Sequence, residues 1–83
     1  MKLSPQDRAS LLREFEAASP ETLFDQRYPA AYLDCSLETI ERDRWAGTGI
    51  PYLKIGRAVR YRKSSILAWA ESHQERQSTS QAA

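Results

Sequence analysis

Apolar residues recur at helical spacing in four segments of the chain, and this pattern predicts four helices. The first segment, residues 4–18, begins with the helix-start pair Ser4-Pro5 and carries a narrow apolar stripe. The members of this stripe are Leu11, Leu12, Phe15 and Ala18. The start signal recurs at Ser19-Pro20, so we expect the first helix to end there.

Two short helices joined by a tight turn are predicted next, over residues 25–33 and 36–46. Asp25 is the expected cap of the first, although Pro29 removes one hydrogen bond from its first turn. Ser36 is a favourable N-cap for the second helix, and Gly47 can end it. Two short helices in this arrangement are typical of a helix-turn-helix, in which the second helix reads DNA.

The apolar period changes from helical to alternating after the loop 47–51, which predicts a β-hairpin over residues 52–62. A three-residue loop, Gly56 to Ala58, sorts the side chains of the hairpin into an apolar face and a basic face. In this register Ile55 pairs with Val59, Leu53 with Tyr61, Lys54 with Arg60 and Tyr52 with Arg62. The prediction is a wing with an apolar floor and a basic outer surface.

A last helix is expected from Lys63 to His73, and residues 74–83 have no apolar period, which predicts a disordered polar tail. The predicted organisation is an amphipathic helix at residues 1–19, a winged helix-turn-helix domain at residues 20–73 and the tail at residues 74–83. The predicted fold class is α+β, a winged helix-turn-helix with a two-stranded hairpin and an extra N-terminal helix.

Charge is divided unevenly along the chain. Residues 1–41 carry four basic and eight acidic side chains, whereas residues 42–63 carry seven basic side chains and one acidic side chain. The net charge of the whole chain is only +1. Such a local concentration of positive charge is typical of a surface that binds a polyanion, and a merely solvated basic face is the alternative.

Length and composition exclude several classes of protein. The 83 residues allow one small domain with no second core. The single cysteine, Cys35, cannot form an intrachain disulfide, and no apolar run is long enough to span a membrane. We therefore expect a cytoplasmic protein without membrane association. The sequence contains no glycine-rich phosphate loop, nucleophile motif or metal-ligand cluster, so we expect no enzyme activity, no metal and no cofactor.

The segment from Ala30 to Trp69 resembles a known family. Three stretches carry the resemblance: AAYLDCSLETIERDR at residues 30–44, GTGIPYLKIGRAVRYR at residues 47–62 and SSILAW at residues 64–69. They are similar to the small winged helix-turn-helix domain of phage and integrative-element excisionases, AlpA-like regulators and the DNA-binding part of MerR-type proteins. The resemblance implies a helix that enters the major groove of double-stranded DNA and a hairpin that approaches the adjacent backbone or minor groove.

Eight residues are the candidates for contact with DNA. Those on the helix after the turn are expected to reach bases, because arginine can pair with guanine and threonine can touch a thymine methyl group. Those on the hairpin are expected to contact phosphates. The candidates are Ser36, Glu38, Thr39, Arg42, Lys54, Arg57, Arg60 and Arg62. For Arg44 and Lys63 a second interpretation stays open, in which they pack against the sheet or cap a helix.

Four aromatic residues are assigned to the core, because a domain this small needs large side chains to fill it. They are Trp45, Tyr52, Tyr61 and Trp69. A stacking platform for single-stranded nucleic acid is the alternative. Cys35 is expected to be a small buried hydrophobic residue in the turn.

Two functions implied by the resemblance use the same domain: an excisionase-type recombination directionality factor that binds repeated sites and bends DNA, and an AlpA-like transcriptional regulator. An integrase or RNA polymerase is the partner that these functions imply. A protein-interaction adaptor that has kept the fold is a further alternative, supported by the acidic first half.

One domain of this kind reads few base pairs, so we expect self-association on adjacent DNA sites. Tandem copies can contact one another along the duplex, or the stripe Leu11, Leu12 and Phe15 can form a dimer contact. The other interpretation is that this stripe packs on its own domain.

Overall fold

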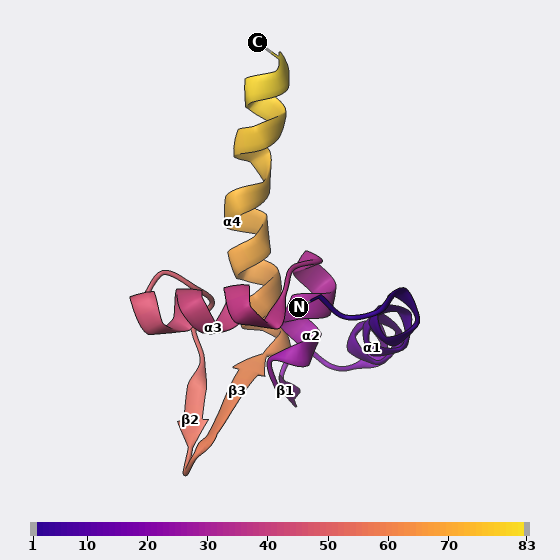
Figure 1. Ribbon diagram of the computed structural model, residues 1–83, viewed down its shortest axis with the longest axis vertical. Helices are drawn as coiled ribbons and strands as arrows, with labels where there is room; N and C mark the ends of the chain where they lie inside the picture. The colour runs from indigo at the N-terminus through magenta and orange to yellow at the C-terminus, as the bar shows by residue number, and fades with distance from the viewer. Residues whose placement is uncertain (1, 83) are drawn as a thin grey trace.

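Helices and the strands of one antiparallel sheet alternate along the chain in the computed structural model, which describes residues 2–82 and the side chains of residues 2–73 (Figure 1). The elements are α1 (Pro5–Ala17), β1 (Leu23–Phe24), α2 (Arg27–Leu33), α3 (Leu37–Ala46), β2 (Leu53–Ile55), β3 (Ala58–Arg62) and α4 (Lys63–Ala82). The α+β winged helix-turn-helix is confirmed, with α2 and α3 as the two helices and the β2–β3 hairpin as the wing. Helix α4 continues to Ala82, past the end that the sequence predicted at His73. The side chains of residues 74–83 lie outside the described ones, so the disorder predicted for this tail stays a prediction.

Helix boundaries follow local capping. Ser4 Oγ accepts a hydrogen bond from the Asp7 amide at 3.2 Å and caps α1 as expected. Helix α2 begins at Arg27 rather than at Asp25, but the Asp25 carboxylate accepts a hydrogen bond from the Arg27 amide at 2.9 Å. Pro29 lies in the first turn of α2, where an amide has no partner within the helix, so the proline does not interrupt it.

The core joins all four helices, β1 and β3. It consists of Phe15, Phe24, Ala30, Ile40, Ile50, Tyr61 and Ile66. Phe15 of α1 is 1% exposed, and its ring centroid lies 5.3 Å from that of Phe24. Helix α1 therefore belongs to the same packed unit as residues 20–73. Its stripe packs on its own domain, which leaves the buried Leu11 and Phe15 unavailable for the dimer contact that the sequence also suggested.

Strand β1 is absent from the sequence prediction. It pairs with β3, with Leu23 opposite Arg62 and Phe24 opposite Tyr61, so the strand order is β1-β3-β2. A strand of two residues has no periodicity of its own, and only its pairing with β3 defines it. The strand anchors the base of the wing, because Phe24 and Tyr61 share the face that is buried in the core.

The predicted register of the wing is wrong by one residue. Ile55 lies opposite Ala58, so the turn consists of Gly56 and Arg57 alone. Gly56 has φ 62°, the positive value that a type II′ turn requires at its first central residue and that glycine adopts without strain. A three-residue loop would place Ala58 in such a conformation. The requirement of the turn therefore overrides the sorting of side chains between the two faces.

The shifted register also removes the apolar floor predicted for the wing. Leu53 and Ile55 face away from the core and are 38% and 55% exposed. The wing is consequently held by its pairing, its turn and the buried Tyr61, rather than by a packed apolar face.

Helix α4 follows β3 without a linker, and carbonyl groups near β1 cap its first turn. The Lys63 amide donates a hydrogen bond to the Thr22 carbonyl, and the Ser64 amide donates to the Pro20 carbonyl, both at 3.0 Å. These bonds satisfy amides that have no partner within the helix. They also fix the start of α4 to the segment that leads into β1.

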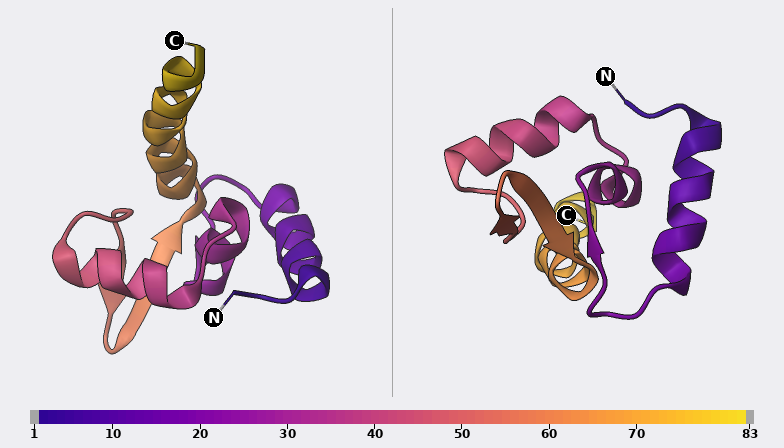
Figure 2. Two further views of the ribbon diagram at one scale, coloured as in Figure 1. Left: turned by 45° about the horizontal axis from the view of Figure 1, so that its top comes forward. Right: turned by 90° about the horizontal axis from the view of Figure 1, so that it is seen from below.

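Helix α2 lies between α1 and α3, and the wing extends away from α4 (Figures 1 and 2). Helix α3 and the wing thus lie side by side, on the side of the molecule remote from α1 (Figure 2). Within the described part of the chain, no helix has the length and apolar character that crossing a membrane requires.

Candidate nucleic-acid interface

The turn between α2 and α3 determines how α3 is presented. Asp34 adopts the left-handed conformation with φ 55°, and its amide donates a hydrogen bond to the Ala31 carbonyl at 3.3 Å, which ends α2. Ser36 Oγ then accepts a hydrogen bond from the Thr39 amide at 3.1 Å, and the two hydroxyl oxygens lie 2.9 Å apart. Two of the predicted contact residues, Ser36 and Thr39, therefore use their hydroxyl groups to start α3.

The outward face of α3 carries Glu38, Arg42 and Trp45, which are spaced at i, i+4 and i+7. The side chain of Arg42 is 74% exposed, and its ion pair with Asp43 is long at 3.9 Å. Ile40, on the inner face, is buried in the core and fixes the rotation of the helix. The structure thus directs Glu38 and Arg42 into solvent, as the sequence predicted for a DNA-reading helix.

The assignment of aromatic residues to the core is correct for Tyr61, which is 1% exposed, and Trp69 packs against the core. It is wrong for Trp45 and Tyr52, which are 85% and 46% exposed. Sequence reasoning considered these two only in its alternative, as part of a stacking platform, and left them out of the eight candidates for contact with DNA. The available signal was position, because Trp45 follows Glu38 by seven residues and so lies on the charged face of the helix.

A polar network holds α3 against the rest of the domain. Gln26 Nε2 donates a hydrogen bond to Glu41 Oε2 at 2.7 Å, and Arg44 Nη1 donates to Gln26 Oε1 at 3.2 Å and to the Tyr61 hydroxyl at 3.0 Å. The network connects α3 to the start of α2 and to β3. Arg44 therefore packs against the sheet, which is the second of the two interpretations left open for it.

The wing divides its basic side chains between two faces. Lys54 lies on the face towards α3, whereas Arg60 and Arg62 alternate with Tyr61 and lie on the opposite face. Arg62 Nη1 is bonded to Glu21 Oε1 at 3.0 Å. Arg57 is exposed in the turn at the tip. The continuous basic surface predicted for the wing is therefore wrong, because the register separates Lys54 from the two arginines.

Lys63 is hydrogen-bonded to the C-terminal end of α1. Its Nζ donates hydrogen bonds to the carbonyl oxygens of Ala18 at 2.8 Å and Glu16 at 3.3 Å, at the C-terminal end of that helix. The ammonium group also lies 5.2 Å from the centroid of the Phe15 ring. Lys63 thus caps a helix, as its second interpretation proposed, and ties α1 to the base of the wing.

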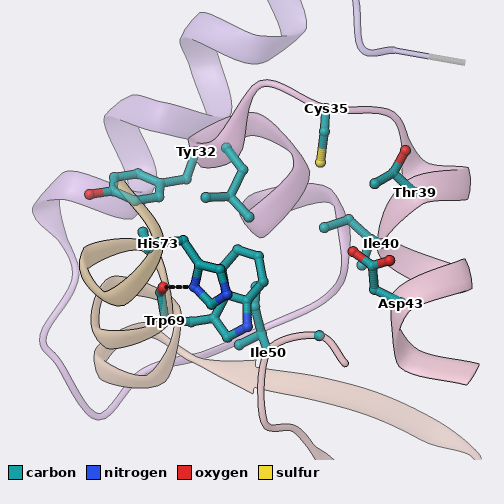
Figure 3. A pocket seen from close by; sticks show the side chains of 11 residues that line it. Tyr32, Cys35, Thr39, Ile40, Asp43, Ile50, Trp69 and His73 are labelled. Carbon is teal, nitrogen blue, oxygen red and sulfur yellow. Dashed lines mark hydrogen bonds between the residues drawn. The ribbon is translucent and has the colours of Figure 1, made fainter. Parts of the chain in front are cut away.

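A groove of about 560 Å³ lies on another side of α3, facing α4 (Figure 3). Ile40 and Asp43 form one wall, and Trp69 and His73, whose rings stack at 4.0 Å, form the other. Cys35 is half-buried there, and its burial, with Asp43 nearby, raises the pKa of the thiol. Among the described residues, no three His, Cys, Asp or Glu side chains are grouped so that they could hold a metal ion.

Residues 30–74 match the family model of the helix-turn-helix domain, which covers more than half of the chain and includes α3 and the wing. The chain belongs to this family. A search of the curated proteins found no match. The helix-turn-helix match identifies the chain as a DNA-binding regulator, and it lies on the segment that carries the resemblance to excisionases and AlpA-like regulators.

Proposed function

We propose that this helix-turn-helix protein binds double-stranded DNA with α3 in the major groove and the wing on the adjacent backbone. In its biological role it is an excisionase-type recombination directionality factor that binds repeated short sites and bends the DNA. The resemblance of residues 47–62 to the excisionase hairpin supports this role.

One observation carries the proposal: α3 and the wing lie side by side, and both carry exposed basic side chains (Figure 2). These side chains are Arg42, Lys54 and Arg57. Helix α1, which carries the exposed acidic residues Glu14 and Glu16, lies on the other side of α2 from α3 (Figure 2). The electrostatic field of the protein therefore attracts a polyanion to α3 and the wing, and repels it from α1.

The length of α3 supports binding to repeated sites. Ten residues of helix extend over about 15 Å, which corresponds to roughly four base pairs of B-DNA. So short a sequence recurs too often in a genome to define one site. Several copies bound at adjacent repeats supply the missing specificity.

Salt dependence of binding tests the interface. With Lys54 and Arg57 on phosphates, the logarithm of the binding constant should fall against the logarithm of salt concentration with a slope of about −2. The duplex is first selected from a random-sequence pool, and binding is then followed by fluorescence anisotropy. Arg57→Ala should flatten the slope by about one unit.

Arg62→Ala is the matched control, because Arg62 is on the opposite face and already paired with Glu21. If the slope flattened in Arg62→Ala and stayed unchanged in Arg57→Ala, the DNA would lie on the Arg62 face of the wing, opposite the face proposed here. If the protein bound no duplex at low salt, the proposal of DNA binding would be refuted and the protein-interaction adaptor would remain as the alternative. Preference for unpaired strands would favour the single-strand alternative.

The directionality-factor role is tested on duplexes that carry one or two copies of the selected site. We expect cooperative occupation of two adjacent copies and a bend that circular permutation of the site reveals as altered gel mobility. Independent binding without bending would contradict this role and favour the transcriptional regulator.

A further inference from the structure

A notch of about 220 Å³ lies between the last turn of α3 and the wing. It is lined by Arg44, Trp45, Tyr52, Lys54 and Val59. A single exposed aromatic residue on a protein surface is ordinary. Here two exposed aromatic side chains stand beside a lysine, and the five lining residues include no carboxylate.

We propose that this notch holds one sugar-phosphate segment of the bound duplex. The Lys54 ammonium group pairs with a phosphate, and the Trp45 indole packs on the neighbouring deoxyribose. This inference rests on the proposed function and extends it to residues that nothing else assigns. With α3 in the major groove and the wing on the adjacent backbone, the backbone strand at the edge of the major groove lies where α3 and the wing meet. That strand has to pass between α3 and the wing.

Two of the residues that line the notch, Arg44 and Lys54, are positively charged. Arg44 is fixed by hydrogen bonds to Gln26 and to the Tyr61 hydroxyl at 3.2 and 3.0 Å. Lys54 lies opposite Val59 in the register, so the strand pairing directs its side chain to the face towards α3. A phosphate in the notch therefore meets the positive charges of Arg44 and Lys54.

The rim of the notch suits a deoxyribose ring. Trp45 is 85% exposed and offers a broad apolar surface, and Tyr52 is held near the core by its ring, whose centroid lies 6.1 Å from that of Tyr61. Covering these rings with the apolar part of a sugar removes them from water. The contact is independent of sequence, because every nucleotide presents the same sugar and phosphate.

Substitution of Trp45 should weaken binding without changing its salt dependence. We expect Trp45→Ala to raise the dissociation constant about tenfold for selected and random duplexes alike, which corresponds to about 1.4 kcal/mol. Its salt slope should equal that of the wild type, whereas Lys54→Gln should flatten the slope by about one unit. Trp45→Phe keeps an aromatic ring and should recover most of the affinity.

Leu23→Ala is the matched control, because Leu23 is 37% exposed on β1, away from the notch. Its affinity for DNA should equal that of the wild type. Each variant is first compared with the wild type by thermal unfolding. If Trp45→Ala fails to fold, the fluorescence comparison of the wild type with Trp45→Phe tests the proposal instead.

Fluorescence gives a readout that a purely structural role would not change. The chain has two tryptophans, so the emission that Trp45→Phe removes belongs to Trp45. Saturating duplex should protect this component from quenching by acrylamide, a neutral quencher, while the component from Trp69 changes little. Two outcomes would overturn the notch proposal and leave the proposed function intact. In the first, the wild type binds duplex while Trp45 stays accessible to acrylamide. In the second, Trp45→Ala binds duplex with wild-type affinity.

Two other results would separate the possible causes of failure. Loss of cooperativity between two sites in Trp45→Ala, with unchanged affinity for one site, would assign the notch to a second copy of the chain instead of DNA. Absence of any duplex binding by the wild type would refute the proposed function itself, and the notch proposal with it.

Discussion

Replacing Phe15 by alanine tests whether α1 is an integral part of the domain. The side chain is 1% exposed and lies between the rings of Phe24 and Tyr32, with centroids at 5.3 and 5.1 Å. Lys63, which caps α1 through Ala18, also lies over the Phe15 ring. The alanine variant loses the ring and leaves a cavity at the contact between α1, β1 and α2.

The expected loss is large compared with the total stability. Truncation of a buried phenylalanine to alanine costs about 3–5 kcal/mol in the free energy of unfolding. A domain of 83 residues has about 4–12 kcal/mol in all. Phe15→Ala should therefore remove at least about a quarter of the free energy of unfolding, and it should lose most of its far-UV circular dichroism well below the urea concentration that unfolds the wild type.

Urea unfolding at two protein concentrations, followed by circular dichroism, measures the effect. Arg13→Ala is the control, because Arg13 is exposed on the same helix and its replacement should change the stability by less than about 0.5 kcal/mol. A Phe15→Ala variant as stable as this control would refute the packing of α1 described above. A wild-type midpoint that rises with protein concentration would show instead that α1 packs on a neighbouring copy.

Three further predictions concern single side chains. Burial raises the pKa of Cys35, so iodoacetamide should alkylate it several-fold more slowly in the native protein than in urea, and equal rates would show an accessible thiol. A Cβ on Gly49 would lie 3.0 Å from Asp43 Cβ, so Gly49→Ala should lower the free energy of unfolding by about 1–3 kcal/mol in a urea titration. Partial burial opposes ionisation of Asp25, but hydrogen bonds from Arg27 outweigh it and lower the pKa. This carboxylate therefore stabilises the fold above its unfolded pKa of about 3.9 and ceases to do so as the pH falls through the folded value, so the melting temperatures of wild type and Asp25→Asn should differ at neutral pH and converge in acid.

Features decided by neighbouring residues could be predicted from the sequence. Ser4 and Ser36 cap their helices through amides three residues later, and Gly47 ends α3 with φ 76°. The helix-turn-helix and the outward face with Glu38 and Arg42 follow from these boundaries and from the helical period. The fold class and the part of the candidate interface on α3 could be predicted for this reason.

Features decided by distant contacts could not be predicted in this way. Strand β1 exists only because β3 pairs with it, and the register of the wing follows the φ requirement of Gly56 instead of the apolar pattern. Hydrophobic character alone placed Trp45 in the core, yet apolar side chains are also common on surfaces. Lys54 and Arg60 lie on opposite faces of the wing as a direct consequence of this register.

Strand β2 is an edge strand with no buried side chain. Its amides should exchange with solvent deuterium much faster than those around Tyr61, because the wing can fray locally while the core stays closed. A partner that covers the wing has to suppress this fraying, and part of the binding free energy is spent on ordering it. In the DNA complex proposed above, this fraying would let the wing follow a backbone whose path varies along the duplex, while α3 remains fixed by the hydrogen bonds of Arg44.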